Sequence, residues 1–591
     1  MADLLARSVR GLRLLLNDPG AFIARVRQRV ASSGKTHDAR QTTYAEWLQV
    51  HLAARNNDRA PQSDATLSLM TTVYERTDAA YLKETAQSLL SQSHPFHEWL
   101  VLAHGPVPAA VDNLLSDLEN DARIKIHRIP VNLGIAGGTR YCIERATGDY
   151  VVPVDADDLL TSDALARVAA AIHRLPGATY FYSDEDALMG GVPREPYWRP
   201  DWDPVLNWTS SYIWHLCVLH RATALALGVY TDRGSEFCHD WDTAFRFWNA
   251  GHTPVHIPEI LYHWRQHEAS TTNRPEAGEA SGGSLASTRH LLERQVARLP
   301  HPERYGVEVF PIFRGATEWH IARRHVHAAA MDLIVLARTA EGGAAALHAI
   351  LDGCDYPVAS IVAVMQCAPQ KDDQAAYASA AGPLADRLQF VHGDGSAALL
   401  DAARRTTADY VAVCSDAVAA VHPESWWEAL KLFELCDDTV LVCGRTTDRE
   451  GLVVQGPAVF GDDALPVFLD AGRAATDAGP YALLLKAHTV GMVHTDFFVA
   501  AGDFLRRASM PAAASLAAAG MWLGASAAAS GRRVAYSPLT AAEVHTKVLG
   551  LTNTQQLDRE ERDAFLAAYR TALPTSRLSA QRYAQSPAPT R

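Results

Sequence analysis

The sequence lacks three features that would place it in an easily identified class. Its 591 residues contain no apolar run long enough to cross a bilayer, and they do not begin with the pattern of a signal peptide. No long block of like charge occurs, and the net charge is −13. These absences disfavour membrane-spanning and nucleic-acid-binding proteins, and they predict a cytoplasmic protein without a nucleic-acid partner.

Paired cysteines are also missing. The eight cysteines are scattered, none belongs to a C-x-x-C pair, and several lie in apolar runs. This spacing predicts reduced core residues rather than disulfides or a zinc site. The composition, 48% apolar and 20% charged, is that of a globular protein. The length allows about three or four domains.

The most informative stretch is an apolar run, residues 150–154, that stops at Asp155, Asp157 and Asp158. A short apolar run bounded by turn signals indicates a buried strand, and ligands of parallel sheets bind beyond the carboxyl ends of their strands. Carboxylates crowded there repel one another, so they favour a bound cation. The alternative is a solvated acidic turn that caps the next helix.

From Thr66 onward, strand and helix patterns alternate, which predicts an α/β fold with a mostly parallel sheet and helices on both faces. The predicted strands are 67–73, 98–103, 124–129, 150–154 and 178–183. The predicted helices are 79–91, 109–120, 162–173 and one that opens with the stretch 132–140 and runs to about residue 146. The Gly-rich stretch 132–140 is not G-x-G-x-x-G and lacks the Lys-Ser/Thr of a P-loop.

Aromatic and acidic residues follow the sheet. The segment 197–208 is rich in tryptophan and proline, and aromatic faces beside carboxylates suit sugar rings. The alternative is that these tryptophans cover a sheet edge. A further helix is predicted over 241–250, and the apolar run 258–265 contains a histidine and an arginine.

Taken together, these motifs resemble a known family. Residues 66–272 are similar to family 2 glycosyltransferases with the GT-A fold, in particular to those that build bacterial capsules and O-antigens. Each motif is short, but their joint order and spacing are specific. In chain order the motifs are 73–74, 132–134, 148–150, 155–158, 182–186, 200–202, 240–242 and 262–265.

The resemblance implies a metal-dependent inverting glycosyltransferase that moves a sugar from a nucleotide-sugar donor, by family default a UDP-sugar, to a hydroxyl of a cell-surface glycan or lipid-linked glycan. Mn²⁺ or Mg²⁺ would be held by Asp155, Asp157 and His263 and would neutralise charge on the departing nucleoside diphosphate. Asp240 would be the catalytic base that takes the proton from the acceptor hydroxyl.

The resemblance also implies two sets of binding residues. Those expected to contact the nucleotide-sugar are Tyr74, Glu75, Asn132, Gly134, Arg140, Asp155, Ala156, Asp157, Asp184 and Asp186. Those expected to contact the acceptor or its sugar are Trp198, Asp201, Trp202, Trp208, Trp241, Asp242 and Arg265.

Residues 331–547 repeat the plan of the first unit without its acids. Alignment of the Asp-Tyr pairs at 149–150 and 409–410 places Ser415 opposite Asp155 and Ala417 opposite Asp157. Residues 520–523 fall opposite 239–242, so the expected base is absent as well. This pattern predicts a degenerate GT-A-like domain. The alternative is a second active site in which Asp416 binds a cation.

We therefore predict four parts: an N-terminal helical segment and linker (1–62), a catalytic GT-A domain (63–325), a degenerate GT-A-like domain (326–560), and a C-terminal helix with a disordered tail (561–591). Residues 1–30 have the pattern of a basic amphipathic helix. Such a helix can dock on the inner face of the cytoplasmic membrane, or it can pack on the protein.

Two rival functions use the same features. The first is a non-catalytic scaffold that binds nucleotide-sugars or glycans, and the second is a metal-dependent nucleotidyltransferase. The nucleotidyltransferase would normally carry a basic, Gly-rich loop after the first strand, whereas residues 74–78 offer only Arg76. The sequence leaves the oligomeric state open, a homo-oligomer included.

Overall fold

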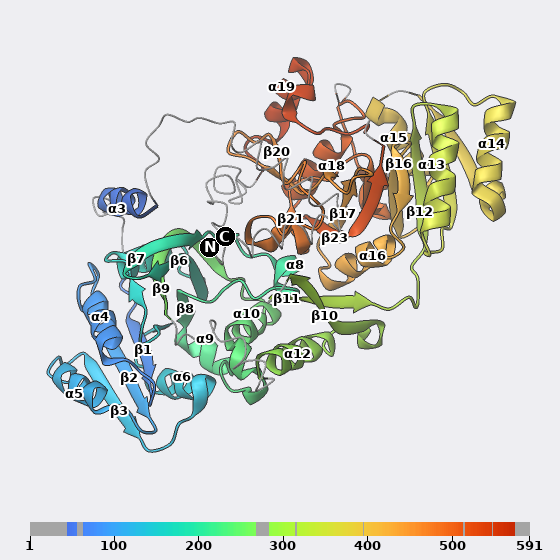
Figure 1. The fold of residues 1–591 in the computed structure, drawn as a ribbon. Coiled ribbons are helices and arrows are strands. Elements are labelled where there is room, and N and C mark those ends of the chain that lie inside the picture. The colour runs from blue at the N-terminus through green and yellow to red at the C-terminus, as the bar shows by residue number, and fades with distance from the viewer. Residues whose placement is uncertain are drawn as a thin grey trace, which may run out of the picture.

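The computed structural model describes residues 44–55, 63–267, 283–313, 316–393, 395–511, 514–545 and 548–573. These form two α/β units, each built around one large sheet (Figure 1). The expectations for residues 1–30 and for the tail after residue 573 lie outside the described residues. Among the helices that are described, none combines the length and hydropathy required to cross a membrane.

The first sheet has the strand order β3-β2-β1-β4-β8-β6-β9-β5, and β7 pairs with β6. Strands β3, β2, β1 and β4 are parallel, but β8 is antiparallel to both neighbours, so the sheet is mixed. The strands are β1 (Leu67–Val73), β2 (Glu98–His104), β3 (Ile124–Ile129), β4 (Tyr150–Pro153), β5 (Leu159–Leu160), β6 (Tyr180–Met189), β7 (Val192–Tyr197), β8 (Cys217–His220) and β9 (Val255–Gln266).

Helices cover both faces of this sheet, as the buried strands predict. Leu69 and Val152 belong to one apolar cluster, whereas their chain neighbours Met70 and Val151 belong to another, because successive strand residues face opposite sides. The helices are α4 (Ala79–Leu90), α5 (Ala109–Leu118), α6 (Gly134–Arg145), α7 (Ala164–Arg174), α8 (Pro204–Asn207), α9 (Arg221–Ala226), the 3₁₀ helix η1 (Arg233–Cys238) and α10 (His239–Asn249).

Helix α3 (Tyr44–Arg55), which precedes the first strand, packs beside β7 (Figure 1). Arg55 is buried, and it forms ion pairs with Asp163 at 2.7 Å and with Glu259 at 3.1 Å. Trp47 meets Trp198 edge-on, with ring centroids 5.7 Å apart. The helix therefore supplies a cation to two acids of the first unit.

The second sheet repeats the first, strand for strand. Its order is β14-β13-β12-β15-β22-β17-β23-β16, so β12, β13, β14 and β15 stand for β1, β2, β3 and β4, and β22 stands for β8. This confirms the repeat expected from the sequence. The strands are β12 (Met331–Ala337), β13 (Ser360–Met365), β14 (Leu388–His392), β15 (Tyr410–Ser415), β16 (Val418–Val421), β17 (Thr439–Thr447), β18 (Val453–Gln455), β21 (His488–Val490), β22 (Phe497–Ala501) and β23 (Arg533–Val544).

One buried pair shows how closely the two sheets correspond. In the first sheet Ser68 lies opposite Glu98, and the Glu98 carboxylate accepts hydrogen bonds from Ser68 and from Thr147, just before β4. In the second sheet the acid lies on the other strand, because Asp332 lies opposite Ser360 and binds its hydroxyl. In both sheets the acid accepts hydrogen bonds from backbone amides just before the fourth strand and so fixes where that strand begins.

A helix and a hairpin connect the two units: α12 (Gly283–Val296), η3 (Pro302–Arg304), β10 (Tyr305–Phe313) and β11 (Ala316–Arg323). Arg323 anchors the hairpin to the second unit through Glu434 at 2.7 Å. A two-stranded sheet contains β19 (Ala458–Phe460) and β20 (Pro466–Phe468). The second unit's helices are α13 (Ala340–Gly353), α14 (Lys371–Ala381), η4 (Gly382–Arg387), α15 (Gly395–Arg405), α16 (Ser425–Leu435), η5 (Pro480–Leu485), α17 (Gly502–Arg507), α18 (Ala519–Ala529), η6 (Thr554–Gln556) and α19 (Arg559–Tyr569).

Candidate active site

The acidic turn follows β4, next to the carboxyl end of β1. The strand that follows β1 in the chain, β2, lies toward one edge of the sheet, whereas the strand that follows β4, β5, lies at the other edge. In open α/β sheets such a reversal of strand order creates a crevice that binds ligands. Tyr74 follows β1, and Asp155 lies two residues beyond β4. The Asp155 side chain is 64% exposed, so it can meet a ligand.

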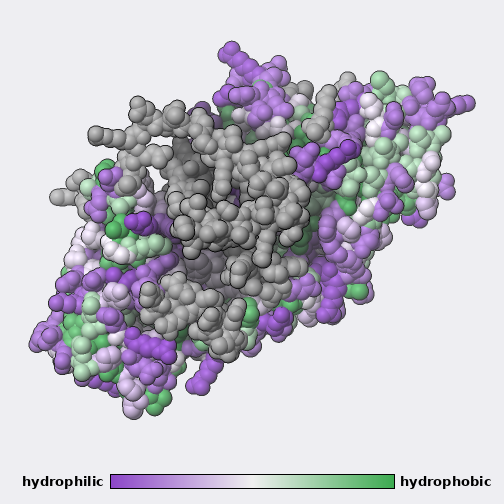
Figure 2. All heavy atoms as spheres, in the orientation of Figure 1, coloured by the Kyte–Doolittle hydropathy of each residue, from purple (hydrophilic) through white to green (hydrophobic). Residues whose placement is uncertain are grey.

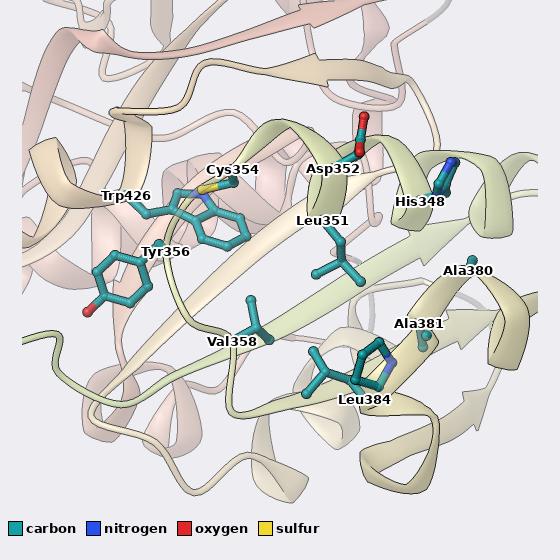
Figure 3. A pocket seen from close by; sticks show the side chains of 12 residues that line it. His348, Leu351, Asp352, Cys354, Tyr356, Val358, Ala380, Ala381, Leu384 and Trp426 are labelled. Atoms are coloured by element: carbon teal, nitrogen blue, oxygen red, sulfur yellow. The ribbon is translucent and has the colours of Figure 1, made fainter. Parts of the chain in front are cut away.

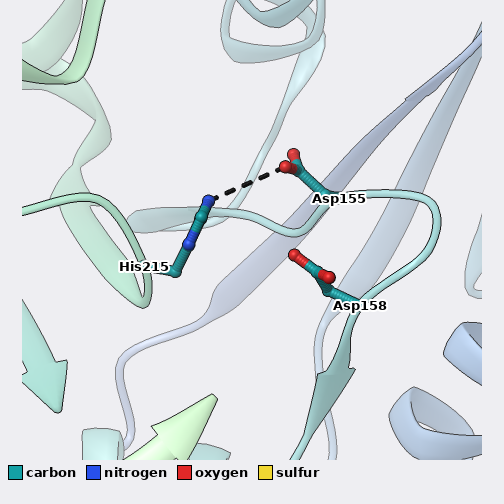
Figure 4. Close-up of side chains that lie close together, drawn as sticks. All are labelled: Asp155, Asp158 and His215. Atoms are coloured by element: carbon teal, nitrogen blue, oxygen red, sulfur yellow. Dashed lines mark ion pairs between the residues drawn. The ribbon is translucent and has the colours of Figure 1, made fainter. Parts of the chain in front are cut away.

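Three side chains meet at this turn: Asp155, Asp158 and His215 (Figure 4). One ligand atom from each lies within 4.8 Å of the others, and His215 Nε2 is 3.7 Å from Asp155 Oδ2. His215 comes from the segment before β8, and Glu185 Oε2 holds its Nδ1 at 3.1 Å. Two carboxylates and an imidazole are donors that suit Mn²⁺.

The electrostatics of this group favour a cation. Burial, together with the charge of Asp155, raises the pKa of Asp158 well above its usual value. Burial also raises the pKa of Asp157, and the charge of Asp155 adds to the shift. The surrounding protein opposes ionisation of Asp155 as well, although its side chain is exposed at the turn, but its ion pair with His215 lowers its net pKa. A divalent cation among these groups would relieve their repulsion.

His215 is the residue that the sequence reasoning missed. Burial alone would lower its pKa, but the carboxylates of Asp155 at 3.7 Å and Glu185 at 3.1 Å raise it well above the usual value. Its ring also stacks on Tyr262, with centroids 4.6 Å apart. No local motif marks this histidine, because its partners lie on other strands. The alignment of the two units could have found it, since Asp496 takes its place in the second.

Asp157 points to a different partner than expected. Its Oδ2 lies 3.0 Å from His267 Nε2, and it is not part of the Asp155 group. Arg265 Nε donates to the backbone oxygen of Asp157 at 2.6 Å, and its amide donates to Asp158 at 2.7 Å. Arg265 is 7% exposed, so this geometry favours a clamp on the acidic turn over the expected acceptor contact.

His263, the expected third metal ligand, lies outside the group of metal-binding atoms. Its neighbour Tyr262 faces the acidic turn and donates a hydrogen bond to Asp158 at 2.7 Å. Successive residues of a strand face opposite sides, so His263 is turned away from that site. Its Nδ1 instead lies 2.6 Å from Asp186 Oδ1. The geometry therefore favours His215 over His263 as the third ligand, and the assignment stays a prediction.

Asp240 lies in the first turn of α10 and is half-buried, with His239 Nε2 3.2 Å from its Oδ1. Burial is the largest effect on its pKa and raises it, whereas His239 and His215 act in the opposite direction. The charge of Asp155 also contributes to the increase, which places Asp240 within electrostatic reach of the acidic turn. A carboxylate with a raised pKa suits a general base.

The two acids expected to contact the sugar lie on β6 and are buried. Asp184 Oδ1 lies 2.8 Å from His256 Nε2, and the other ring nitrogen of His256 is 3.0 Å from Asp201. The second oxygen of Asp184 is buried without a partner. Asp186 accepts a hydrogen bond from Tyr44 of α3 at 2.7 Å.

The Gly-rich stretch forms a turn before α6. Gly134 has a φ of +77°, and its amide donates to Asn132 Oδ1 at 2.8 Å. The next amide donates to the carboxylate of Glu236, so an acid already lies at this helix end. Arg140 points along α6 to Glu144 at 2.8 Å. Tyr74 and Ala156 are half-buried near the end of β1 and in the acidic turn, and Glu75 is exposed.

Two of the tryptophans pack inside the protein. Trp208 and Trp241 are 5% and 3% exposed, and Trp241 Nε1 donates to the backbone oxygen of Asn207 at 2.7 Å. Asp242 is buried as well and is bound by Arg246 and Arg294. For these three residues, the geometry favours packing over the expected acceptor contact. Trp198 and Trp202 are half-buried, and Asp201 is exposed.

The second unit has no comparable acidic group among its described residues. Asp416 occupies the position of Ala156, and its Oδ1 forms an ion pair with Arg338 Nε at 2.8 Å. The guanidinium therefore neutralises the Asp416 carboxylate. Ser415 takes the place of Asp155 and donates to Asp496 at 2.5 Å. Helix α18, which replaces α10, carries no acid. These replacements weigh against the alternative of a second metal site.

A pocket of about 340 Å³ lies in the second unit, far along the chain from the acidic turn (Figure 3). Its lining is mostly apolar and includes Leu351, Val358, Leu384 and Trp426. On the face shown in Figure 2, pale green residues gather in the region of α13 and α14, near this pocket. None of its lining residues belongs to the candidate site.

Residues 68–225 match the model of the family described as Glycosyl transferase family 2. The O-antigen biosynthesis protein RfbC of Myxococcus xanthus is 29% identical over 253 residues, which cover 42% of this chain and 20% of RfbC. The uncharacterized protein y4gI of Sinorhizobium fredii is 30% identical over 248 residues, or 41% of this chain and 26% of y4gI. The putative glycosyltransferase EpsE of Bacillus subtilis is 27% identical over 199 residues, or 31% of this chain and 68% of EpsE.

Among solved structures, Staphylococcus aureus TarS 1–349 in complex with UDP is 18% identical and has a TM-score of 0.31 over 40% of this chain and 69% of that chain. Its complex with UDP-GlcNAc has a TM-score of 0.34 at 16% identity, over 40% of this chain and 70% of that one. The family match and the matched relatives agree with the mixed α/β sheet: residues 68–225 are similar to family 2 glycosyltransferases.

Proposed function

We propose that the first unit is a metal-dependent inverting glycosyltransferase that acts on a cell-envelope polysaccharide. The observation that carries the proposal is the group of Asp155, Asp158 and His215, with Asp240 in electrostatic reach, at the crevice of a family 2 domain. The printed names of relatives, O-antigen biosynthesis for RfbC and teichuronic acid biosynthesis for a Bacillus subtilis relative, support this substrate class.

In this proposal Asp240 takes the proton from the acceptor hydroxyl. The hydroxyl oxygen then forms a bond to the anomeric carbon as the bond from that carbon to the diphosphate oxygen breaks. The configuration at the anomeric carbon inverts, and the nucleoside diphosphate leaves with the bonding electrons. Burial that raises the pKa of Asp240 makes it a stronger base toward a hydroxyl than an ordinary aspartate.

The residues at the acidic turn fit a divalent cation such as Mn²⁺. Asp155, Asp158 and His215 would hold it, Asp157 lies next to them in the chain, and Arg265 keeps the turn in place. When bound, the cation would supply positive charge opposite the departing diphosphate. We propose a UDP-sugar donor on the family resemblance alone.

A donor-binding experiment and a turnover experiment together test the proposal. A thermal-shift screen of nucleotide sugars with Mn²⁺ identifies the donor, because a ligand that binds the folded state raises the melting temperature. Asp240→Asn should then abolish transfer while it retains the donor-induced shift. Asp117→Asn, which makes the same change at an exposed position of α5, is the matched control and should transfer at the normal rate.

Three outcomes discriminate between the proposal and its rivals. Near-normal turnover of Asp240→Asn would refute the base assignment. Donor binding without transfer to any glycan acceptor would favour the non-catalytic scaffold. Release of pyrophosphate from a nucleoside triphosphate would favour the nucleotidyltransferase.

A further inference from the structure

The segment that carries His215 has little regular structure of its own. It runs from residue 198 to residue 216, all of them described, and α8 is its one helix. A segment of this kind depends on neighbouring elements to fix its conformation. The position of His215 beside Asp155 therefore depends on what packs against the segment.

Two residues of the second unit make direct hydrogen bonds to this segment. Thr489 of β21 donates its amide to Asp203 Oδ2 at 2.7 Å and its hydroxyl to Asp203 Oδ1 at 2.8 Å. Lys486 Nζ donates to Ser210 Oγ at 2.9 Å. Asp203 is 4% exposed and caps α8 through the amides of Val205 and Leu206, so the bonds from Thr489 complete the partners of a carboxylate that water does not reach.

An apolar contact accompanies these bonds. Leu483 of η5 is 4% exposed and belongs to an apolar cluster of the first unit. Members of that cluster from the segment are Leu206, Tyr212 and Ile213. The second unit therefore contributes a side chain to the core of the first.

The contacts continue from Asp203 toward the acidic turn. The Asp203 amide donates to the Tyr212 hydroxyl at 2.8 Å, and the Tyr212 backbone oxygen accepts from Arg199 Nε at 2.7 Å. Arg199 is 3.0 Å from Glu185, and Glu185 holds His215. Every side chain in this chain of contacts from Asp203 to Glu185 is buried.

We propose that the second unit, whose own acids are replaced, acts as a scaffold that positions His215 against Asp155. Thr489 and Leu483 are its positioning residues. The consequence for metal binding rests on the proposed function, but the positioning itself does not. The two can therefore be tested by separate measurements on the full-length chain.

The first measurement is hydrogen exchange of peptides that cover residues 203–216. Thr489→Val keeps the backbone donor but removes the hydroxyl donor to Asp203, so these peptides should exchange at least about tenfold faster. Thr489→Ser should restore the protection, because serine donates the same bond. Thr407→Val changes an exposed side chain of the second unit and is the control. Unchanged exchange in both Thr489→Val and Leu483→Ala would overturn the proposal.

The second measurement is Mn²⁺ affinity, from titrations followed by electron paramagnetic resonance. Thr489→Val should weaken Mn²⁺ binding in the wild-type background and have little further effect in a His215→Ala background, since the scaffold acts through His215. Equal weakening in both backgrounds would overturn the proposal. Absence of Mn²⁺ binding by the wild type would refute the metal in the proposed function, and hydrogen exchange alone would then decide the positioning.

Discussion

His215 and Asp496 occupy the same position in the two sheets. In the first sheet His220 pairs with Tyr150, and in the second sheet Ala501 pairs with the equivalent Tyr410. His215 lies five positions before His220, and Asp496 lies five positions before Ala501. His215 faces the carboxylate of Asp155, whereas Asp496 accepts a hydrogen bond from Ser415.

The replacement of His215 by Asp496 in the second unit has a chemical consequence. A histidine beside an acid in the first unit leaves ligand atoms for a cation. The buried carboxylate of Asp496 is instead fully engaged, by Ser415, Gln455 and two backbone amides. The second unit keeps the contact between the two strands but uses it for packing.

His215→Ala should weaken Mn²⁺ binding by at least about tenfold and reduce turnover, because it removes one ligand and the partner that keeps Asp155 ionised. A Mn²⁺ titration and a coupled assay for nucleoside diphosphate release measure both effects. His220→Gln is a matched control near the same strand. If both variants bind Mn²⁺ like the wild type, His215 is not a ligand.

The rate should depend on the ionisation of Asp240. Since burial raises its pKa and the base must be deprotonated, kcat/KM should fall with decreasing pH, at a pH above the aspartate value of about 4. A pH–rate profile checks this. A profile that stays flat down to about pH 4 would contradict the assignment.

Asp240 should also cost stability. A carboxyl whose folded pKa is raised binds a proton more readily in the folded state, so its contribution to stability falls as pH rises from the unfolded to the folded pKa. Asp240→Asn should therefore have a higher melting temperature than the wild type at neutral pH, measured with a chelator present. An unchanged or lower melting temperature would show that the buried charge of Asp240 does not destabilise the folded state.

Glu98 should produce the opposite pH dependence. Burial opposes its ionisation, but hydrogen bonds from Lys125, Ser68 and Thr147 lower its pKa to about 2. Its contribution to stability is therefore complete above the unfolded value and is lost as pH falls from about 4.5 toward about 2. Glu98→Gln should lose about 2–3 kcal/mol of unfolding free energy at neutral pH. Urea titrations of this variant should show a smaller decrease of unfolding free energy as the pH falls. Glu119→Gln, at an exposed ion pair, should do neither.

Asp416→Asn should separate stability from activity. Arg338 donates its amide and its guanidinium to Asp416, so the variant should lose about 1–3 kcal/mol of unfolding free energy. Its kcat/KM should equal that of the wild type at a temperature where both are folded. A complete loss of transfer in a folded variant would show that the second unit is catalytic.

The order of strands and helices could be predicted from the sequence because it depends on local patterns. Apolar runs bounded by turn residues gave the expected bounds of β1 and β3 to the residue. The repeat was also visible in the sequence, since the pair at Asp149-Tyr150 recurs at Asp409-Tyr410. The mixed character of the sheet was not, because strand direction depends on the path of long connections such as the one that contains α8.

The acidic turn after β4 and the absence of its acids in the repeat were determined by the sequence alone, because each is a run of neighbouring residues. The partners of those acids were decided by the tertiary structure. Strand alternation turned Tyr262 toward the turn and His263 away from it, and a long segment held by the second unit brought His215 to Asp155. A sequence shows which side chains are available, but only packing between distant segments determines which of them meet.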